Sequence, residues 1–427
     1  MTDAAVSFSS LMAHRPFARF WTARLATNAA YQMQAVAVGW QIYDLTNNPL
    51  DLGIIGLVQF LPVVGMALII GQTVDRYDRR MIAAVCQVLK ATAAIALAIG
   101  TLGGWLSREA IFAILFVAGT ARAFEVPTMH SLVPSLVPKA MLPRAIAASA
   151  SATQTAIICG PAIGGFLYLS GAATVYFTCM AIFVVAGVLV MTVAITPQRT
   201  DKKPVTLSTL LAGFSYIWTR PVLLGAITLD LFVVLLSGVT ALLPIFARDI
   251  LATGPWGLGL LRSAPAVGAL SMSAFLAHRS LGHEVGAKLF ASVGVFGVAI
   301  VVFSLSRSLA LSLGALVVYG AMDAVSVVIR HSLVQTRTPA DMLGRVIAVN
   351  AMFTGTTGSL GQFRAGVLAA LLGAVPSALI GGIGAIAVTA LWLWCFPDLK
   401  RIGSLEPEPV LERDAPTEPR EAAGKAG

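Results

Sequence analysis

The residues of this sequence that could do chemistry are ionisable side chains placed inside long apolar runs. Residues 119–133, GTARAFEVPTMHSLV, hold Arg122 and Glu125 three positions apart, so both share one helix face and could pair. Pro127 follows and removes one backbone hydrogen bond of that helix. A charge at the centre of a bilayer helix costs at least about 2.5 to 3.5 kcal/mol on an insertion scale. Such side chains therefore either pair with one another or line a polar path.

Further polar side chains occur at comparable depth in other apolar runs. They are Arg24, Asn28, Gln32, Gln34, Gln154, Asp230, Asp323, Arg330, Asn350, Gln362 and Arg364. Tyr31 is also deep enough to contact a bound molecule. The charges fall mainly in the first, fourth, seventh and tenth runs, with Lys90 and Arg364 as exceptions. For any one residue a structural ion pair explains the charge equally well, but the set favours convergence on one water-accessible chamber.

The elements that must position these residues are membrane-spanning helices. Of 427 residues, 57% are hydrophobic and 11% charged, against about 25% charged in soluble proteins. Runs of about 20 apolar residues span a bilayer, and such spans must be helices because lipid offers the backbone no hydrogen bonds. The twelve runs lie near 18–42, 52–71, 81–103, 110–133, 145–169, 173–195, 221–246, 256–277, 285–305, 309–331, 346–371 and 375–396. The sequence therefore predicts an all-α membrane protein with twelve spans.

Lysines and arginines concentrate in alternate loops, which predicts the orientation of the chain. The basic set is Arg15, Arg19, Arg76, Arg79, Arg80, Lys139, Arg144, Arg199, Lys202, Lys203, Arg279, Lys288, Arg337, Arg345, Lys400 and Arg401, and the alternate set is Arg108, Arg248, Arg262 and Arg307. Both termini are therefore expected in the cytoplasm. The net charge of +9 is explained by this topology and by lipid headgroups, so no nucleic-acid partner is expected.

An internal repeat divides the spans into two halves. At an offset of 201 residues, ten of the eighteen positions from His130 to Ala147 are identical to His331 to Ala348. The same offset pairs Gly119 with Gly320, Gly160 with Gly361, Gly165 with Gly366 and Arg122 with Asp323. The predicted parts are a six-helix half at 1–196, a cytoplasmic linker at 197–220, a second six-helix half at 221–397 and a disordered tail at 398–427. The tail is polar and rich in proline, so it cannot bury enough surface to fold.

The loop GQTVDRYDRR, residues 71–80, resembles the G-x-x-x-D-R-x-G-R-R motif of the major facilitator superfamily, with Asp78 where that pattern has glycine. The resemblance implies a gating latch made by Gly71, Asp75, Arg76, Arg79 and Arg80. The segment GPAIGG is similar to the glycine–proline motif of exporters in this superfamily. Its Gly160 and Gly164 form a small-xxx-small face, and we expect Gly160, Pro161, Gly164 and Gly165 to mediate helix packing.

Residues 17–64, together with VPKAML and TPADMLGRVIAVN, resemble the group that contains the enterobactin exporter and the macrolide efflux pumps. The resemblance covers roughly residues 12 to 400. It implies the major facilitator fold, with two pseudo-symmetric six-helix bundles in a bacterial inner membrane. It also implies a monomer that exports a small siderophore-like or drug-like molecule in exchange for protons, through a cavity lined by spans 1, 4, 7 and 10.

If the chain is such an exporter, specific functions can be assigned to its ionisable residues. The expected proton carriers are Asp230, Asp323 and Glu125, because burial raises the pKa of a carboxylate and a nearby arginine lowers it. Arg122 is the expected switchable partner, and Arg24, near the cytoplasmic mouth, could meet an anionic substrate. The expected cavity residues are Arg24, Asn28, Tyr31, Gln32, Arg122, Gln154 and Arg330.

Other classes of protein are disfavoured by what the sequence lacks. His283-Glu284 begins an HExxH pattern, but Ala287 stands where the second histidine belongs, so neither a metal site nor a cofactor is expected. The cysteines Cys86, Cys159, Cys179 and Cys395 lie in apolar spans and form no paired motif. No cluster of nucleophile and base suggests a membrane enzyme. Uptake by symport and a transport-inactive receptor or scaffold remain as alternatives.

Overall fold

The computed structural model of the chain describes residues 8–194, 207–279 and 282–403. Within these ranges every regular element is a helix. The first part contains α1 (Phe8–Ala13), α2 (Arg15–Thr46), α3 (Pro49–Gly65), α4 (Ala67–Arg76), α5 (Arg79–Leu102), α6 (Arg108–Leu132), α7 (Leu142–Leu167) and α8 (Ala172–Met191), with 3-10 turns η1 (Val133–Ser135), η2 (Lys139–Met141) and η3 (Tyr168–Ser170). The predicted all-α class is confirmed.

The second part begins with α9 (Leu207–Trp218) and α10 (Pro221–Ser237). The seventh predicted span then continues through η4 (Val239–Leu242), α11 (Leu243–Ile245) and the π-helical turn η5 (Phe246–Ile250). The remaining helices are α12 (Gly254–His278), α13 (Val285–Leu305), α14 (Leu309–Arg337), α15 (Ala340–Leu372), α16 (Ala374–Cys395) and α17 (Pro397–Lys400).

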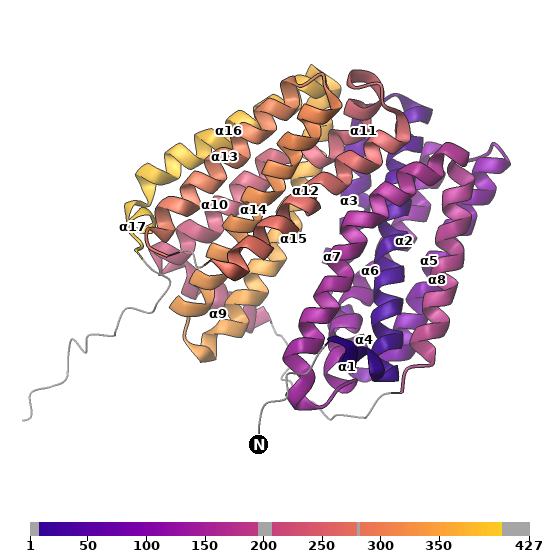
Figure 1. Cartoon of the computed structure of the whole chain (residues 1–427), viewed down its shortest axis with the longest axis horizontal. Coiled ribbons are helices and arrows are strands. Elements are labelled where there is room, and N and C mark those ends of the chain that lie inside the picture. Colours follow the sequence, from indigo (N-terminus) through magenta and orange to yellow (C-terminus); the bar gives the residue numbers. More distant parts are fainter. Residues whose placement is uncertain (1–7, 195–206, 280–281, 404–427) are drawn as a thin grey trace, which may run out of the picture.

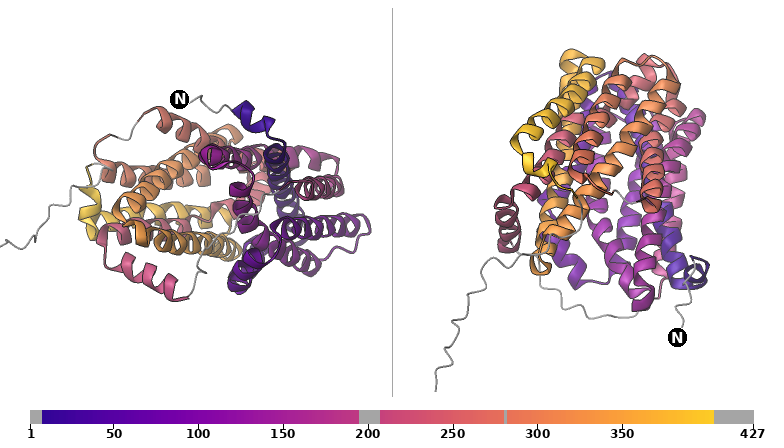
Figure 2. Two further views of the ribbon diagram at one scale, coloured as in Figure 1. Left: turned by 90° about the horizontal axis from the view of Figure 1, so that it is seen from below. Right: turned by 60° about the vertical axis from the view of Figure 1, so that its left-hand side comes forward.

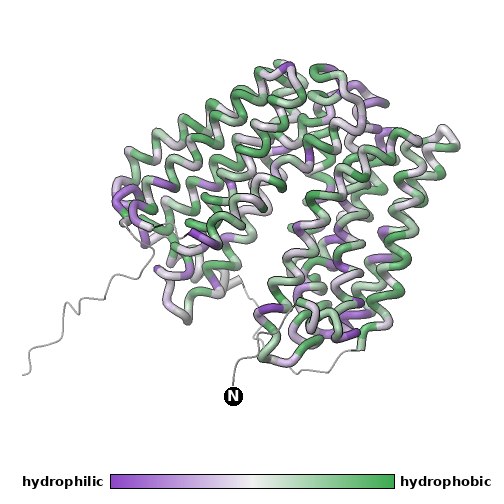
Figure 3. Tube along the Cα trace, viewed as in Figure 1, coloured by the Kyte–Doolittle hydropathy of each residue, from purple (hydrophilic) through white to green (hydrophobic). Residues whose placement is uncertain are grey.

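Nine helices in the described ranges are long and apolar enough to cross a membrane, and α3 is a shorter apolar helix. Helices α2 and α15 have 32 and 33 residues, about 50 Å each at 1.5 Å per residue, which is long enough to cross a bilayer although neither is among the nine. Counted with α3, they make the fold consistent with twelve spans. Figure 3 shows apolar residues along most of the helices, with hydrophilic residues gathered near helix ends.

The helices form two groups, α2 to α8 and α10 to α17, which lie side by side (Figures 1 and 2). We call these groups the first and second bundle. We call the end at which α2 begins and α16 ends the basic face, and the other end the opposite face. The helices of the two bundles diverge toward the basic face and approach one another at the opposite face (Figure 1).

Close backbone contacts join the bundles on the side of the opposite face. A Cβ atom added at Gly165 of α7 would lie 2.6 Å from the Pro255 carbonyl of α12, and one added at Gly366 of α15 would lie 2.8 Å from the Gly53 Cα atom of α3. Ser263 also donates a hydrogen bond of 2.6 Å to the Ile158 carbonyl across the bundles. The paired glycines of the repeat, Gly165 and Gly366, thus occupy corresponding contacts between the bundles.

The seventh span is broken at Gly238, whose φ of +44° is left-handed. A break inside lipid frees carbonyl groups that must find donors. Arg364 of α15 supplies these donors. Its Nε donates to the Leu235 carbonyl at 3.0 Å, and its Nη2 donates to the Leu236 carbonyl. This charge in the eleventh span therefore closes a helix break within the predicted span 221–246, which the structure extends to Pro221–Ile250.

The predicted linker and tail contain helical structure where they are described. Helix α9 lies inside the predicted linker 197–220 and packs on α15, with the rings of Phe214 and Phe353 centred 6.3 Å apart. The Gly286 amide donates to the Ile402 carbonyl at 3.1 Å, so residues 398–403 rest against α13. Residues 197–206 of the predicted linker and 404–427 of the predicted tail lie outside the described residues. The four-part division of the chain stays a prediction.

Candidate functional site

A cavity of about 750 Å³ lies between the two bundles. Its lining comes from α2, α3, α4, α6 and α7 of the first bundle and from η4, α11, α12 and α15 of the second. The polar lining residues are Tyr31, Gln32, Gln59, Arg122, Thr240, Arg262, Ser359 and Gln362. Helices α2 and α15, which are not among the nine apolar helices, both contribute polar side chains to this lining, namely Tyr31 and Gln32 of α2 and Ser359 and Gln362 of α15.

Tyr31 organises the polar wall of the cavity. Its hydroxyl donates to Gln59 Oε1 at 3.0 Å. The Arg122 guanidinium carbon lies 3.6 Å from the centre of the Tyr31 ring, a stacking arrangement that stabilises a cation over an aromatic face. The cavity therefore holds a fixed aromatic platform with a positive charge above it.

Three of the predicted cavity residues line this cavity, namely Tyr31, Gln32 and Arg122. The other four, Arg24, Asn28, Gln154 and Arg330, lie elsewhere: Gln154 donates to the Ala266 carbonyl at 3.3 Å across the bundles, and the rest belong to buried clusters described below. Sequence reasoning missed Gln59 and placed Arg262 among loop residues. The position of Arg262 well inside the predicted span 256–277 was the signal that could have identified it.

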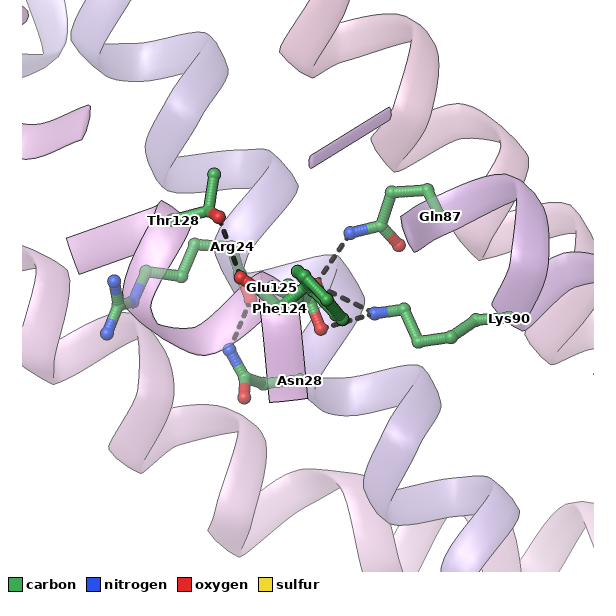
Figure 4. Close-up of polar contacts among 7 residues, drawn as sticks. All are labelled: Arg24, Asn28, Gln87, Lys90, Phe124, Glu125 and Thr128. Atoms are coloured by element: carbon green, nitrogen blue, oxygen red, sulfur yellow. Dashed lines mark hydrogen bonds and ion pairs between the residues drawn. The ribbon is translucent and has the colours of Figure 1, made fainter. Parts of the chain in front are cut away.

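Arg24 lies in a buried cluster of the first bundle. Its Nε donates to Thr153 Oγ1 at 3.1 Å, and its Nη2 lies 3.4 Å from His130 Nε2. Asn28 donates to the Arg24 carbonyl at 2.8 Å (Figure 4). The cluster joins α2, α6 and α7, and Arg24 is not among the residues that line the cavity.

Glu125 lies in a second buried cluster, between α6 and α5. Lys90 Nζ lies 2.7 Å from each carboxylate oxygen of Glu125, and Gln87 Nε2 donates to Oε1 at 2.7 Å (Figure 4). The side chains of Lys90 and Glu125 are 2% and 4% exposed. The expected pairing of Glu125 with Arg122 is therefore wrong, because Lys90 takes the carboxylate while Arg122 turns to the cavity.

Asp230 of α10 and Arg330 of α14 form a buried pair within the second bundle. The Arg330 guanidinium contacts the Asp230 carboxylate, and each side chain is 6% exposed. Asp323 and Ser326 line a small pocket together with Asp230. The expected proton carriers thus lie in two separate clusters inside their own bundles, and in this conformation they do not share one chamber with Arg122.

The predicted gating loop lies at the basic face of the first bundle. Arg79 donates to the Ser131 carbonyl at 3.1 Å, and Arg80 donates to the Val193 carbonyl at 3.1 Å. Arg80 also pairs with Asp78 at 3.1 Å, and its hydrogen bond holds the pKa of Asp78 below its usual range. The loop is therefore tied within its own bundle.

The other residues of that loop make fewer contacts. Arg76 is exposed at the end of α4, and the side chain of Asp75 lies outside the described part of the structure. A Cβ added at Gly71 would meet nothing from a neighbouring element within 4 Å, so no other helix packs closely on Gly71 in this conformation.

A polar contact closes the opposite face. Tyr43 of α2 donates to Asp249 Oδ2 at 2.5 Å, and Arg248 Nη1 donates to the Tyr43 carbonyl at 3.2 Å. Arg248 also pairs with Asp44 at 3.5 Å. We call these four residues the opposite-face gate. They link the end of α2 to η5 and so join the two bundles.

The glycines of the GPAIGG segment pack closely on neighbouring helices. A Cβ atom added at Gly160 would lie 2.8 Å from Gln32 Cβ, and one added at Gly164 would lie 2.7 Å from Met33 Cα. Both positions hold α7 against α2. Pro161 is buried within the same helix and lines the cavity.

Comparisons with known proteins place this architecture in a family. A sequence profile of the transmembrane secretion effector family matches residues 6–418. The enterobactin exporter of Citrobacter koseri is 26% identical over 416 residues, which are 95% of this chain and 97% of that protein. The enterobactin exporter of Escherichia coli O1:K1 is 26% identical over 407 residues, 94% of this chain and 97% of that protein.

Solved transporters share the fold at lower identity. A bacterial homologue of the lysosomal transporter Spinster, inward-facing and occupied, has a TM-score of 0.71 at 12% identity over 91% of this chain and 98% of that chain. A bacterial homologue of the iron transporter ferroportin, inward-facing, has a TM-score of 0.68 at 18% identity over 90% and 98%. The chain belongs to the transmembrane secretion effector family of the major facilitator superfamily, and it is a multi-pass membrane transporter of small molecules.

Proposed function

We propose that the chain exports a small organic molecule, siderophore-like or drug-like, from the bacterial cytoplasm in exchange for protons. The observation that carries this proposal is the polar cavity between two bundles that are joined at the opposite face. It acts as a monomer in the inner membrane, with both termini in the cytoplasm. On that orientation the bundles diverge toward the cytoplasm, the state from which an exporter loads. The enterobactin exporters related to it over nearly their whole length support the direction of transport.

Alternating access requires the opposite-face gate to open while the bundles close at the basic face. The gate is suited to this because its contacts lie at the ends of α2 and η5, and its ion pair is partly exposed, with side-chain exposures of 29% for Arg248 and 59% for Asp44. Partly exposed ion pairs contribute little stability, typically below about 1 kcal/mol. The gate can therefore break without a large penalty.

We expect loss of the gate to open the cavity to the outside. With the four native cysteines replaced by serine and Ser359→Cys placed in the cavity, Arg248→Gln should raise labelling by a membrane-impermeant maleimide in intact cells by about threefold to tenfold, since charge-assisted hydrogen bonds are lost. The matched control is Arg307→Gln, an exposed arginine of the α13–α14 loop at the same face. Equal labelling of all three proteins would contradict the gate.

The proposed proton carriers are Asp230, Asp323 and Glu125. Each lies deep in a bundle, and Asp230 and Glu125 are held by a cation whose contact can change as the bundles move. Replacing protein contacts by water, or the reverse, changes the preference of a carboxylate for its proton. Asp323 is the foremost candidate, because it lines a pocket with Asp230 and none of its oxygens is engaged in an ion pair among the described residues.

Asp323→Asn should therefore lower pH-driven flux by about tenfold or more, because asparagine cannot carry a proton. A loss of about tenfold lies within the usual range for coupling between two ligand sites, here the proton site and the substrate site. Flux of enterobactin, fluorescein and rhodamine 123 into proteoliposomes, with and without a pH gradient, measures this. Substrate exchange without a gradient should persist in the variant. Glu109→Gln, an exposed carboxylate at the opposite face, is the control. Unchanged pH-driven flux in Asp323→Asn, Asp230→Asn and Glu125→Gln would remove the proton assignment.

A further inference from the structure

The central cavity is positively charged. Arg122 from α6 of the first bundle and Arg262 from α12 of the second both line it, and the lining residues in the described chain include no acidic side chain. The other polar groups are neutral hydroxyl and amide groups, those of Tyr31, Gln32, Gln59, Thr240, Ser359 and Gln362. A chamber with low-dielectric walls and one sign of charge concentrates ligands of the opposite sign.

These two arginines differ from other cations inside the spans. Lys90 and Arg330 contact Glu125 and Asp230, Arg24 bonds Thr153 and His130, and Arg364 bonds the carbonyls of Leu235 and Leu236. Neither Arg122 nor Arg262 has an ion pair or a hydrogen bond from its guanidinium within the described ranges. A charge removed from bulk water without an anion beside it is costly. A ligand that brought an anionic group to Arg122 or Arg262 would therefore reduce that cost, and the N–H groups of both guanidinium groups are available to it.

Tyr31 and the two arginines line the same cavity. The Tyr31 ring stacks beneath the Arg122 guanidinium, 3.6 Å from the ring centre. Stacking occupies the face of a guanidinium and leaves the N–H groups on its edge free to donate. Carboxylate and phosphate oxygens match that edge in a bidentate geometry.

We propose that Arg122 and Arg262 form a two-armed site for an amphipathic organic anion, a molecule with a carboxylate or phosphate group on an aromatic or aliphatic body. This inference rests on the proposed export function and names the substrate class. The apolar body has a wall to contact in Phe60, Val63, Ile70, Val126 and Leu243. A volume of about 750 Å³ lies within the usual range for a small-molecule site.

The site also links binding to movement, because the two arginines come from different bundles. When the bundles close over the cavity, two positive charges approach one another and repel. An anion between them replaces that repulsion with two attractions. Closure is therefore favoured when the anion is bound, which is what an exporter needs to avoid cycling empty.

Two dyes with one xanthene skeleton and opposite charge test the proposal. Fluorescence anisotropy with the purified full chain in non-ionic detergent should show fluorescein, an anion, binding at least about tenfold more tightly than rhodamine 123, a cation. Arg122→Gln and Arg262→Gln should each weaken fluorescein binding by about tenfold to hundredfold, the usual effect of removing a charged hydrogen-bond donor. The double variant Arg122→Glu with Arg262→Glu should prefer rhodamine 123. Excess benzoate or phenyl phosphate should displace fluorescein from the wild-type protein.

The matched control is Arg307→Gln, which removes the same charge from an exposed loop and should bind fluorescein as the wild type does. Size-exclusion profiles show whether each variant is folded, and Arg262→Lys, which keeps the charge, should retain part of the affinity. Equal binding of both dyes, no fluorescein binding, or unchanged binding in both glutamine variants overturns the anion site. Proton-driven flux of rhodamine 123 by the wild type would then leave the export proposal standing while the anion proposal falls.

Discussion

Lys90→Met should lower the free energy of unfolding by about 3 to 5 kcal/mol, the usual cost of removing one partner from a buried ion pair. Glu125 would keep only Gln87 as a donor at a position where its side chain is 4% exposed. Its carboxylate would then lie buried with no cation beside it, which penalises the charged form. The measurement is the equilibrium unfolding midpoint of the purified protein in mixed detergent, with the slope of the transition fitted separately.

The double variant Lys90→Met with Glu125→Leu separates the charge from the packing. Replacing both partners of a buried pair by apolar residues is often neutral or stabilising, so the double variant should recover to within about 1 kcal/mol of the wild type. If Lys90→Met costs less than about 1 kcal/mol, the pair is not dry. If the double variant is folded and keeps pH-driven transport, Glu125 is no proton carrier and the assignment narrows to Asp230 and Asp323.

The fold was predictable because lipid imposes two strict requirements, apolar length and a closed backbone hydrogen-bond pattern. Runs of the required length therefore mark helices almost without regard to the rest of the sequence. The break at Gly238 escaped prediction because the donor that makes it tolerable, Arg364, lies far along the chain. A glycine in the sequence does not by itself predict a break in a helix, because most of the helical glycines in the described residues lie where a neighbouring helix packs closely.

The candidate site was predictable only in part. Position along a helix gives the depth of a side chain, and so Tyr31, Gln32 and Arg122 were expected near a cavity that they do line. The position of a residue along its helix does not reveal which side chain it pairs with, because that depends on which helix packs beside it. Glu125 bonds Lys90 from α5 instead of Arg122 three residues away, because α5 packs beside α6. Of the four spans expected to line the cavity, spans 1, 4 and 7 contribute residues, whereas the described residues of span 10 contribute none. Spans 2, 5, 8 and 11 contribute as well, and their polar lining residues are amides and a hydroxyl in addition to one charge.

The internal repeat predicted more than the number of spans. Gly165 and Gly366, equivalent at the 201-residue offset, lie at two of the contacts that join the bundles, α7 with α12 and α3 with α15. Each half thus contributes one equivalent glycine to the closed opposite face. Because both contacts are backbone-to-backbone, their stability depends on the absence of a side chain, and a single methyl group is enough to disturb either one.

Gly165→Ala and Gly366→Ala should each open the opposite face. The added methyl would lie 2.6 Å from the Pro255 carbonyl or 2.8 Å from the Gly53 Cα atom, and overpacking of this kind costs about 1 to 3 kcal/mol. That cost falls on the state in which the bundles touch there, so labelling of Ser359→Cys from outside intact cells should rise about fivefold to hundredfold.

Gly314→Ala in α14 is the matched control, because no atom lies within 4 Å of its added Cβ and alanine favours a helix over glycine by about 1 kcal/mol. It should label as the parent does and be no less stable. Suppose instead that Gly165→Ala or Gly366→Ala is labelled no more than the parent. Then the helices at that glycine, α7 and α12 or α3 and α15, can move apart enough to accept a methyl group while the opposite face stays closed. The glycine contacts would then not hold the bundles together, and the opposite-face gate of Tyr43, Asp44, Arg248 and Asp249 would have to close the cavity alone.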